Sequence, residues 1–150
     1  EIFGHEGLEA DLEVHELALD VLVDAGVETL TMDLADARIL RAVLAGVPLD
    51  ADGLQDIAAA LSLKDAQALS RLSGPLPVEA RQGLAALLRL YGGADVLAAA
   101  RTELPARPMI GKALDDLQWL SSRLAAAHPA LHIGFDLGLG PAGSVLRWPP

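Results

Sequence analysis

Cysteine is absent from the sequence, which excludes disulfide bonds and thiolate metal sites. The same absence fits a reducing compartment, and we expect a cytoplasmic protein. Long apolar runs are also missing. No segment approaches the ~18 uninterrupted apolar residues that a membrane-spanning helix requires, although 52% of the residues are hydrophobic. The apolar residues, mostly Leu and Ala, therefore predict a protein core and no contact with a membrane.

Basic residues are missing from the start of the chain. Residues 1–34 contain ten acidic side chains and no Lys or Arg, and the whole sequence has a net charge of −10. Lys and Arg drive phosphate binding because they replace counterions, so this balance argues against a nucleic-acid partner. The 150 residues are enough for one sizeable core, or for one core and a small satellite.

Neither end of the chain resembles the end of a complete domain. The sequence opens on Glu1 without a Met, and it closes on Trp148-Pro149-Pro150 without a helix or strand pattern. We therefore expect a fragment, or the ordered part of a longer protein.

The first 34 residues predict a helix followed by a strand. A helix over residues 10–25 is indicated by apolar residues at helical spacing, which are Val14, Ala18, Val21, Leu22 and Ala25. Leu12 and Leu19 form a second apolar line, so we expect this helix to be covered on more than one side. Gly26 is expected to be its left-handed C-cap. Residues 28–34 then alternate with a period of two, which predicts a strand with one wet or ligand-facing side.

Helical patterns fill residues 36–130, where we expect no strand. Asp36, and either Asp50 or Asp52, are suited to cap helices in this segment. The last helix has the clearest pattern, with a stripe that comprises Ile110, Ala113, Leu114, Leu117, Leu120 and Leu124.

Alternation returns at residues 131–137, which predicts a second strand. The predicted fold is therefore a helix-rich α+β fold. Residues 1–35 and 131–137 form part of a core with an antiparallel sheet, residues 36–130 form a helical insertion, and residues 138–150 form an irregular tail. We expect the strands at residues 28–34 and 131–137 to belong to one antiparallel sheet.

Several local motifs do not complete a site. Gly138–Gly143 matches GxGxxG after a predicted strand, but no helix opens inside it and no acidic residue follows about 20 positions on. His5-Glu6 and His15-Glu16 begin like HExxH, but neither has a histidine at the closing position. Asp50–Gly53 resembles the start of a calcium loop but lacks the closing glutamate. We expect no metal, no cofactor and no catalytic residue.

A family resemblance is carried by short segments along most of the chain. Residues 1–4, EIFG, and 9–14, EADLEV, resemble the end of motif two in class II aminoacyl-tRNA synthetases of the histidyl type. The strand Leu30–Leu34 and the later Phe135–Leu137 agree with that scheme in order and spacing. The resemblance covers about residues 1–137.

A second set of segments narrows the resemblance. Residues 90–97, LYGGADVL, followed by Ala100-Arg101 and Leu104-Pro105, are similar to the helical insertion of one branch of this superfamily. That branch is the histidyl-tRNA synthetase-like regulatory subunit of ATP phosphoribosyltransferase. Lys64-Asp65 and the helix before it match the same insertion.

The resemblance implies a non-catalytic regulatory subunit. In that family it joins a short-form catalytic subunit in a hetero-oligomer, activates the first committed step of histidine biosynthesis and takes part in inhibition by the effector histidine. By resemblance, Glu1 falls on a carboxylate that contacts the amino group of bound histidine. A desolvated ammonium needs such a charge-assisted acceptor. Without the resemblance, a solvated residue at the end of a strand is the simpler interpretation of Glu1.

The chain departs from the family pattern after Leu137. The family continues there into an arginine- and tyrosine-containing segment that closes the amino-acid pocket, whereas residues 138–150 contain no Tyr. Two alternatives stay open, which are a histidyl-tRNA synthetase and a helical scaffold without a ligand. The segment 36–130 carries ten basic and ten acidic residues, and this neutrality argues against contact with tRNA.

Overall fold

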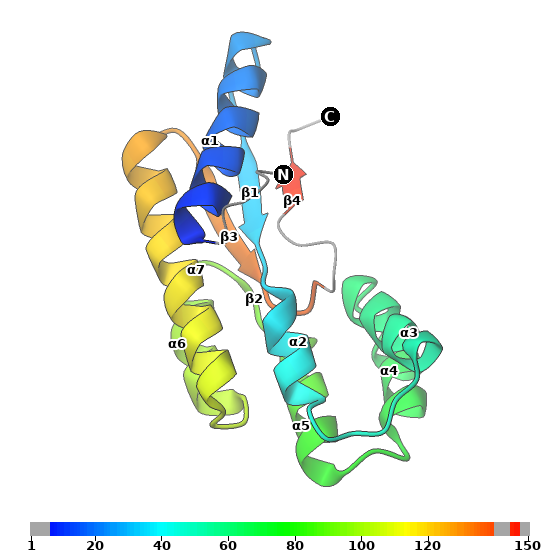
Figure 1. The fold of residues 1–150 in the computed structure, drawn as a ribbon. Helices are drawn as coiled ribbons and strands as arrows, with labels where there is room; N and C mark the ends of the chain where they lie inside the picture. The colour runs from blue at the N-terminus through cyan, green and yellow to red at the C-terminus, as the bar shows by residue number, and fades with distance from the viewer. Residues whose placement is uncertain (1–6, 140–144, 148–150) are drawn as a thin grey trace.

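The computed structural model describes residues 7–139 and 145–147. This part of the chain forms seven helices and a four-stranded mixed sheet, so the predicted helix-rich α+β class is confirmed (Figure 1). The helices are α1 Leu8–Asp24, α2 Ala37–Val43, α3 Ala51–Ser62, α4 Ala66–Ser73, α5 Val78–Leu87, α6 Asp95–Glu103 and α7 Pro108–Ala127. The strands are β1 Thr31–Leu34, β2 Tyr91–Gly92, β3 His132–Asp136 and β4 Val145–Arg147. None of the helices in the described ranges is long and apolar enough to cross a membrane.

Helix α1 ends at the glycine that the sequence indicates. Gly26 has a φ of +87°. Its N–H donates to the carbonyl of Val23 at 2.9 Å, and the N–H of Val27 donates to the carbonyl of Leu22 at 3.0 Å. These two bonds form a Schellman motif, which uses carbonyls that a helix end would otherwise leave unpaired. The predicted left-handed C-cap is confirmed.

The burial of α1 differs from the prediction. Leu19 is buried at 1% exposure, whereas Val14 and Val21 are exposed at 37% and 59%. The spacing of apolar residues marked two faces of α1 for the core, and within the described residues the Leu19 face is the one that is buried. Helical periodicity identifies apolar faces but does not say which of them the rest of the chain will cover.

The sheet has the strand order β2-β3-β1-β4. Strands β1 and β3 are neighbours in it, but they run parallel, with Thr31 opposite His132 and Leu34 opposite Phe135. The predicted antiparallel pairing of these two strands is therefore wrong. Alternation fixes which side chains share a face and leaves the direction of the strand open. The helices between β1 and β3 form the long crossover that a parallel pair requires.

Two further strands lie where the sequence predicts none. Strand β2 falls inside residues 36–130 and pairs antiparallel with β3, with Tyr91 opposite Asp136. Strand β4 falls in the segment expected to be irregular and pairs antiparallel with β1. Two or three residues are too few to show a period of two, so the pattern could not reveal them. The wider division into a core and an insertion stays a prediction.

Aspartate side chains begin three of the helices. Asp36 accepts a hydrogen bond from the N–H of Arg38 at 2.9 Å, Asp50 from Gly53 at 2.8 Å, and Asp65 from Ala68 at 2.9 Å. Each bond satisfies a first-turn N–H that has no partner inside its helix. The predicted caps at Asp36 and Asp50 are confirmed.

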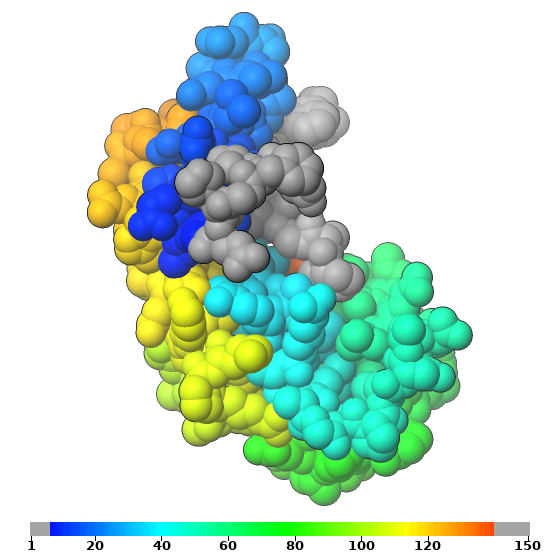
Figure 2. Space-filling model, in the orientation of Figure 1, coloured from blue at the N-terminus to red at the C-terminus, as the bar shows by residue number. Residues whose placement is uncertain are grey.

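Helix α7 runs between α1, beside the sheet, and helices that lie further from the sheet. It packs against α1 near the sheet and against α2 and α6 further along (Figure 1). All six residues of its predicted apolar stripe are buried. They join Met32 and Leu34 of β1 and Phe135 of β3 in one continuous hydrophobic cluster. Figure 2 shows the surface of α7, in yellow, lying beside that of α2, in cyan.

Helices α2 and α5 approach each other closely at Gly83. A Cβ atom at this position would lie 2.7 Å from Cγ1 of Val43, so a side chain would force the helices apart. Arg107 fixes the end of α2 by donating to the carbonyls of Ala42 and Ala45 at 2.6 and 3.2 Å. These carbonyls lie at a helix end, where acceptors lack intrahelical partners.

Candidate functional site

The residue that the resemblance assigns to histidine binding, Glu1, lies outside the described residues, as does most of the Gly138–Gly143 motif. Within residues 7–139 and 145–147, no group of three or more His, Asp or Glu side chains could hold a metal ion. The candidate site must therefore be built from other side chains that the fold brings together.

Three segments that carry the family resemblance meet at one point. They are the turn at Lys64, the strand β2 at Tyr91, and the end of β3 at Asp136. Nζ of Lys64 lies 2.6 Å from Oδ1 of Asp136 and 4.9 Å from the centre of the Tyr91 ring. We call Lys64, Tyr91, Asp136 and Gly138 the Lys64 junction.

Lys64 occupies an unusual backbone conformation. Its φ is +54°, and it is the only non-glycine residue with a positive φ in the described parts of the chain. Its N–H donates to the carbonyl of Leu61 at 3.1 Å, and the N–H of Asp65 donates to that of Ala60 at 2.9 Å. These bonds form the same helix-ending motif as at Gly26, here with lysine in the position that glycine prefers. Left-handed backbone costs a residue with a Cβ about 1–2 kcal/mol, so interactions elsewhere in the fold offset that cost.

Asp136 is a buried carboxylate with two donors. Its side chain is 8% exposed, and Oδ1 accepts from Nζ of Lys64 and, at 3.1 Å, from the N–H of Gly138. A buried charge is tolerated only when it is paired and hydrogen-bonded. A Cβ on Gly138 would lie 2.8 Å from the carbonyl oxygen of Leu87 and 3.1 Å from Nζ of Lys64. Glycine is therefore required for the chain to leave β3 beside this ion pair.

Tyr91 of the neighbouring strand completes the junction. Its backbone pairs with Asp136 in the sheet, and the N–H of Leu137 donates to the carbonyl of Leu90 at 3.0 Å. The ring of Tyr91 faces the ammonium of Lys64, an attraction worth about 0.5–1 kcal/mol at an exposed site. The junction thus ties the α3–α4 turn and β2 to the residue after which the chain leaves the sheet.

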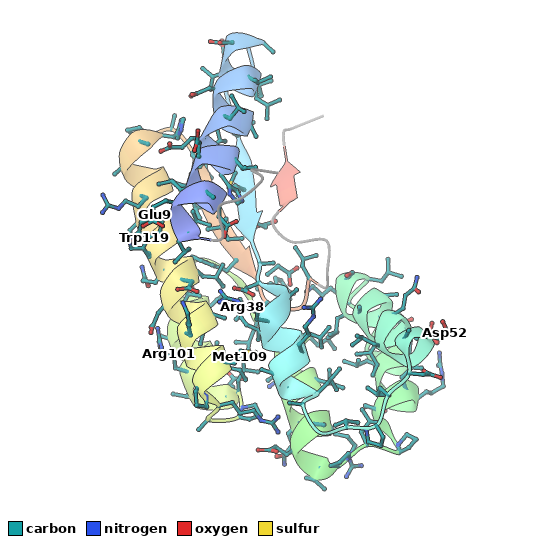
Figure 3. All side chains as sticks on the ribbon, viewed as in Figure 1. Glu9, Arg38, Asp52, Arg101, Met109 and Trp119 are labelled. Atoms are coloured by element: carbon teal, nitrogen blue, oxygen red, sulfur yellow. The ribbon has the colours of Figure 1, made fainter. Side chains whose placement is uncertain are left out.

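A second charged cluster joins α2 to α7. Arg38 donates from Nε to both oxygens of Asp36 at 3.0 Å, and its terminal nitrogen lies 2.7 Å from Oδ2 of Asp116. Nζ of Lys112 lies 3.0 Å from the same Asp116 oxygen. Figure 3 shows Arg38 at the start of α2, on the side of α7. The cluster holds two partly buried acids with two cations and braces the helices.

The pKa of Asp116 reports this environment. Burial alone would raise the pKa, but hydrogen bonds from Arg38 and Lys112, with the attraction of both charges, lower it below the ordinary value. The hydrogen bond to Asp36 is the largest cause of a raised pKa at Arg38. Both groups are charged at neutral pH, so the cluster stabilises the structure and has no proton to exchange there.

The sequence model of the family described as Histidyl-tRNA synthetase matches residues 1–141. The chain belongs to the histidyl-tRNA synthetase family. Three of its curated relatives carry the name ATP phosphoribosyltransferase regulatory subunit. The relative from Variovorax paradoxus is 49% identical over 138 residues, and that from Albidiferax ferrireducens 47% over 137 residues. The relative from Ralstonia nicotianae is 46% identical over 127 residues.

The matched residues make up most of this chain and a minor part of each relative. They include 91%, 91% and 85% of the chain, but only 36%, 35% and 33% of the respective relatives. The chain thus spans about a third of the length of these curated relatives. The resemblance to the regulatory branch of the family is confirmed by these names.

A solved structure shows the same fold. The chain superposes on a Bacillus halodurans protein described as an ATP phosphoribosyltransferase regulatory subunit/histidyl-tRNA synthetase, with a TM-score of 0.75 and 22% identity. The superposition covers 96% of this chain and 40% of that one. The histidyl-tRNA synthetase-like fold predicted from the sequence is confirmed.

Sequence reasoning found the pieces of the Lys64 junction but not the junction itself. Lys64, Tyr91 and Asp136 all lie in segments quoted for the resemblance, yet nothing in their spacing pairs them. The link between Arg38 and Asp116 was missed altogether, because 78 residues separate the two. One available signal was Lys64 directly after an apolar helix and before the cap Asp65, where a glycine is expected.

Proposed function

We propose that this chain is part of a regulatory subunit of ATP phosphoribosyltransferase, which activates the catalytic subunit and takes part in feedback inhibition by histidine. The observation that carries the proposal is the name shared by relatives 46–49% identical to it over most of the chain. The proposed partner is the short-form catalytic subunit, joined in a hetero-oligomer in the cytoplasm. In this proposal the chain has no catalytic role of its own.

Glu1 keeps its proposed role at the effector site. A carboxylate at this position would accept a charge-assisted hydrogen bond from the ammonium group of histidine. Such a bond is strong where water is excluded, because an unpaired ammonium is costly to bury. The proposal for Glu1 rests on the resemblance.

The Lys64 junction links the residue that follows Leu137 to the helices. In the resemblance, a segment after Leu137 closes the amino-acid pocket, but residues 138–150 of this chain do not match that segment. The junction holds Gly138 against the ion pair of Lys64 and Asp136. A displacement of Gly138 would therefore reach the α3–α4 turn through two hydrogen bonds.

A histidyl-tRNA synthetase is the second candidate, favoured by the family description and by the joint name of the Bacillus halodurans protein. The two functions are separated by one experiment on the full-length protein. Mixing it with the short-form catalytic subunit should raise phosphoribosyl transfer to ATP, histidine should lower that activity, and no aminoacylation of tRNA should be detected. Measured aminoacylation would assign the enzyme instead.

The same assay tests Glu1. Glu1→Gln keeps the shape of the side chain and removes its charge, and loss of a charged hydrogen bond costs about 1.5–3 kcal/mol. Histidine sensitivity should weaken by about 10- to 150-fold, while activation of the partner survives. Glu9→Gln is the matched control, because Glu9 is an exposed carboxylate on α1 and should leave sensitivity unchanged. Unchanged inhibition in Glu1→Gln would remove Glu1 from the site.

A further inference from the structure

Helices α4 and α5 border a groove of about 590 Å³ that is open to solvent. Its floor is apolar and includes Leu69, which is 4% exposed, together with Leu88. The complete lining comprises Ala66, Leu69, Ser70, Ser73, Gly74, Val78, Arg81, Gln82, Ala85, Leu88 and Arg89.

The lining residues form one face of each helix. On α4 they are residues 66, 69, 70 and 73, and on α5 they are residues 78, 81, 82 and 85. This is the three- and four-residue spacing that puts side chains on a single helix face. Four of these eight residues, Ala66, Ser70, Ser73 and Ala85, are small, which lets another backbone approach closely. The groove therefore has the shape that accepts a third helix along the first two.

The charge of the groove is unlike that of the chain. The protein carries a net charge of −10, yet the charged residues in the groove lining are two arginines and no acid. Arg81 makes no ion pair with any residue that the structure describes, while Arg89 contacts Glu103 at 3.0 Å in an exposed pair. Exposed pairs of this kind are weak and exchange partners at little cost.

The two arginines indicate the charge of the ligand. Arg81 lies on α5, and Arg89 lies two residues beyond the end of that helix at Leu87. Because the lining contains no acidic residue, they favour a ligand that carries carboxylates, and its apolar residues would meet Leu69 and Leu88.

We propose that the α4–α5 groove docks an amphipathic helix of the catalytic partner, with carboxylates on the face that enters the groove. The proposal rests on the proposed function, because it takes the catalytic subunit as the partner. The groove adjoins the Lys64 junction, because its lining residues Ala66 and Arg89 lie two positions from Lys64 and Tyr91, respectively.

The test compares charge reversals in the full-length regulatory protein. Binding to the short-form catalytic subunit is measured by titration calorimetry for Arg81→Glu and for Arg71→Glu. Arg71 is an exposed arginine on α4 outside the groove lining and serves as the matched control. We expect Arg81→Glu to weaken binding about 10-fold or more and Arg71→Glu to change it less than about 2-fold. Equal effects of the two variants would overturn the proposal.

A second pair of variants tests the groove by steric blocking, without a change of charge. Ser70→Phe fills the groove, whereas Gln67→Phe adds the same ring to an exposed site of α4 outside it. Only Ser70→Phe should weaken the complex, with circular dichroism and melting temperature unchanged in both. Sedimentation of the regulatory protein alone identifies a different occupant. An oligomer that Arg81→Glu dissociates would show that a second copy fills the groove, and the proposal would fail.

The two proposals can fail separately. If wild-type protein and catalytic subunit form no complex, the proposed function is wrong and the groove proposal is wrong with it. If they form a complex whose affinity is indifferent to Arg81→Glu and Ser70→Phe, the function stands and the groove proposal is wrong.

Discussion

Lys64 and Asp136 lie 72 residues apart in the chain, and their side chains meet at 2.6 Å. The lysine side chain is 29% exposed and the aspartate 8%. The pair is therefore screened less by water than the exposed ion pairs of this protein. It joins the helical segment to the end of the central strands.

A double-mutant cycle measures this pair. Lys64→Met keeps the stem of the side chain but leaves Asp136 with the Gly138 N–H alone, so unfolding free energy should fall by about 1–3 kcal/mol. Adding Asp136→Asn should recover part of the loss, with a coupling of about 0.5–3 kcal/mol. Urea unfolding gives both values. Lys112→Met, at an exposed lysine paired with Asp116, should lose about 0.5 kcal/mol or less. A coupling near zero would contradict the structural role of the pair.

The backbone at Lys64 makes a separate prediction. Because φ is +54° there, Lys64→Gly should be more stable than Lys64→Ala by about 1 kcal/mol. Both variants lack the ion pair, so the difference isolates the backbone. Gln118, exposed in the middle of α7, provides the control. There the glycine variant should be the less stable one, by about 1 kcal/mol. The same sign at both positions would show that Lys64 is unstrained.

Two helical glycines should respond in opposite directions to alanine. Gly83→Ala places a methyl group 2.7 Å from Val43, and overpacking of this kind costs about 1–3 kcal/mol. Gly111 has nothing within 4 Å of its Cβ position, so Gly111→Ala should stabilise α7 by about 0.5–1 kcal/mol. Thermal unfolding of the two variants beside the parent decides the matter. A stabilised Gly83→Ala would mean that α2 and α5 pack less closely than described.

The charged cluster between α2 and α7 predicts that the stability of the protein depends on pH. The folded-state pKa of Asp116 is lowered, so this carboxylate contributes stability above its ordinary pKa and loses it as pH falls through the lowered value. Asp116→Asn should therefore be about 1–2 kcal/mol less stable than the parent at neutral pH. The gap should close as pH falls below about 4, the ordinary carboxyl value. Denaturant unfolding at a series of pH values measures it.

Asp115→Asn is the control for that series. Asp115 is the neighbouring residue on α7, 69% exposed, and its pair with Arg101 is also exposed. Its variant should stay close to the parent at every pH. A gap for Asp116→Asn that does not depend on pH would show that its carboxylate is not held in the charged form.

The sequence predicted the features that repeat or that act locally. The stripe from Ile110 to Leu124 repeats over about four turns, and all of it is buried. The caps at Asp36 and Asp50 depend on bonds to residues two and three positions away. Features of this range are encoded in a single window of residues.

Features that depend on distant partners were not predictable in the same way. The parallel direction of β1 and β3 is set by the packing of the helices between them, and the alternation of Met32 and Leu34 is the same in either direction. Val14 and Val21 have the spacing of core residues, and their exposure depends on what lies opposite them. The Lys64 junction forms where three segments meet, and the sequence of each segment does not indicate where the other two will lie.

The parallel pair of β1 and β3 has a consequence for synthesis on the ribosome. Thr31 and His132 are neighbours in the sheet but are roughly 100 residues apart in the chain, which takes about 5–20 s to translate at 5–20 residues per second. Local helices form within microseconds of emerging. During those seconds β1 has no β3 to pair with. The apolar side chains of Met32 and Leu34 can then contact chaperones or neighbouring chains. The nascent chain is therefore more prone to aggregate before β3 is made than after it.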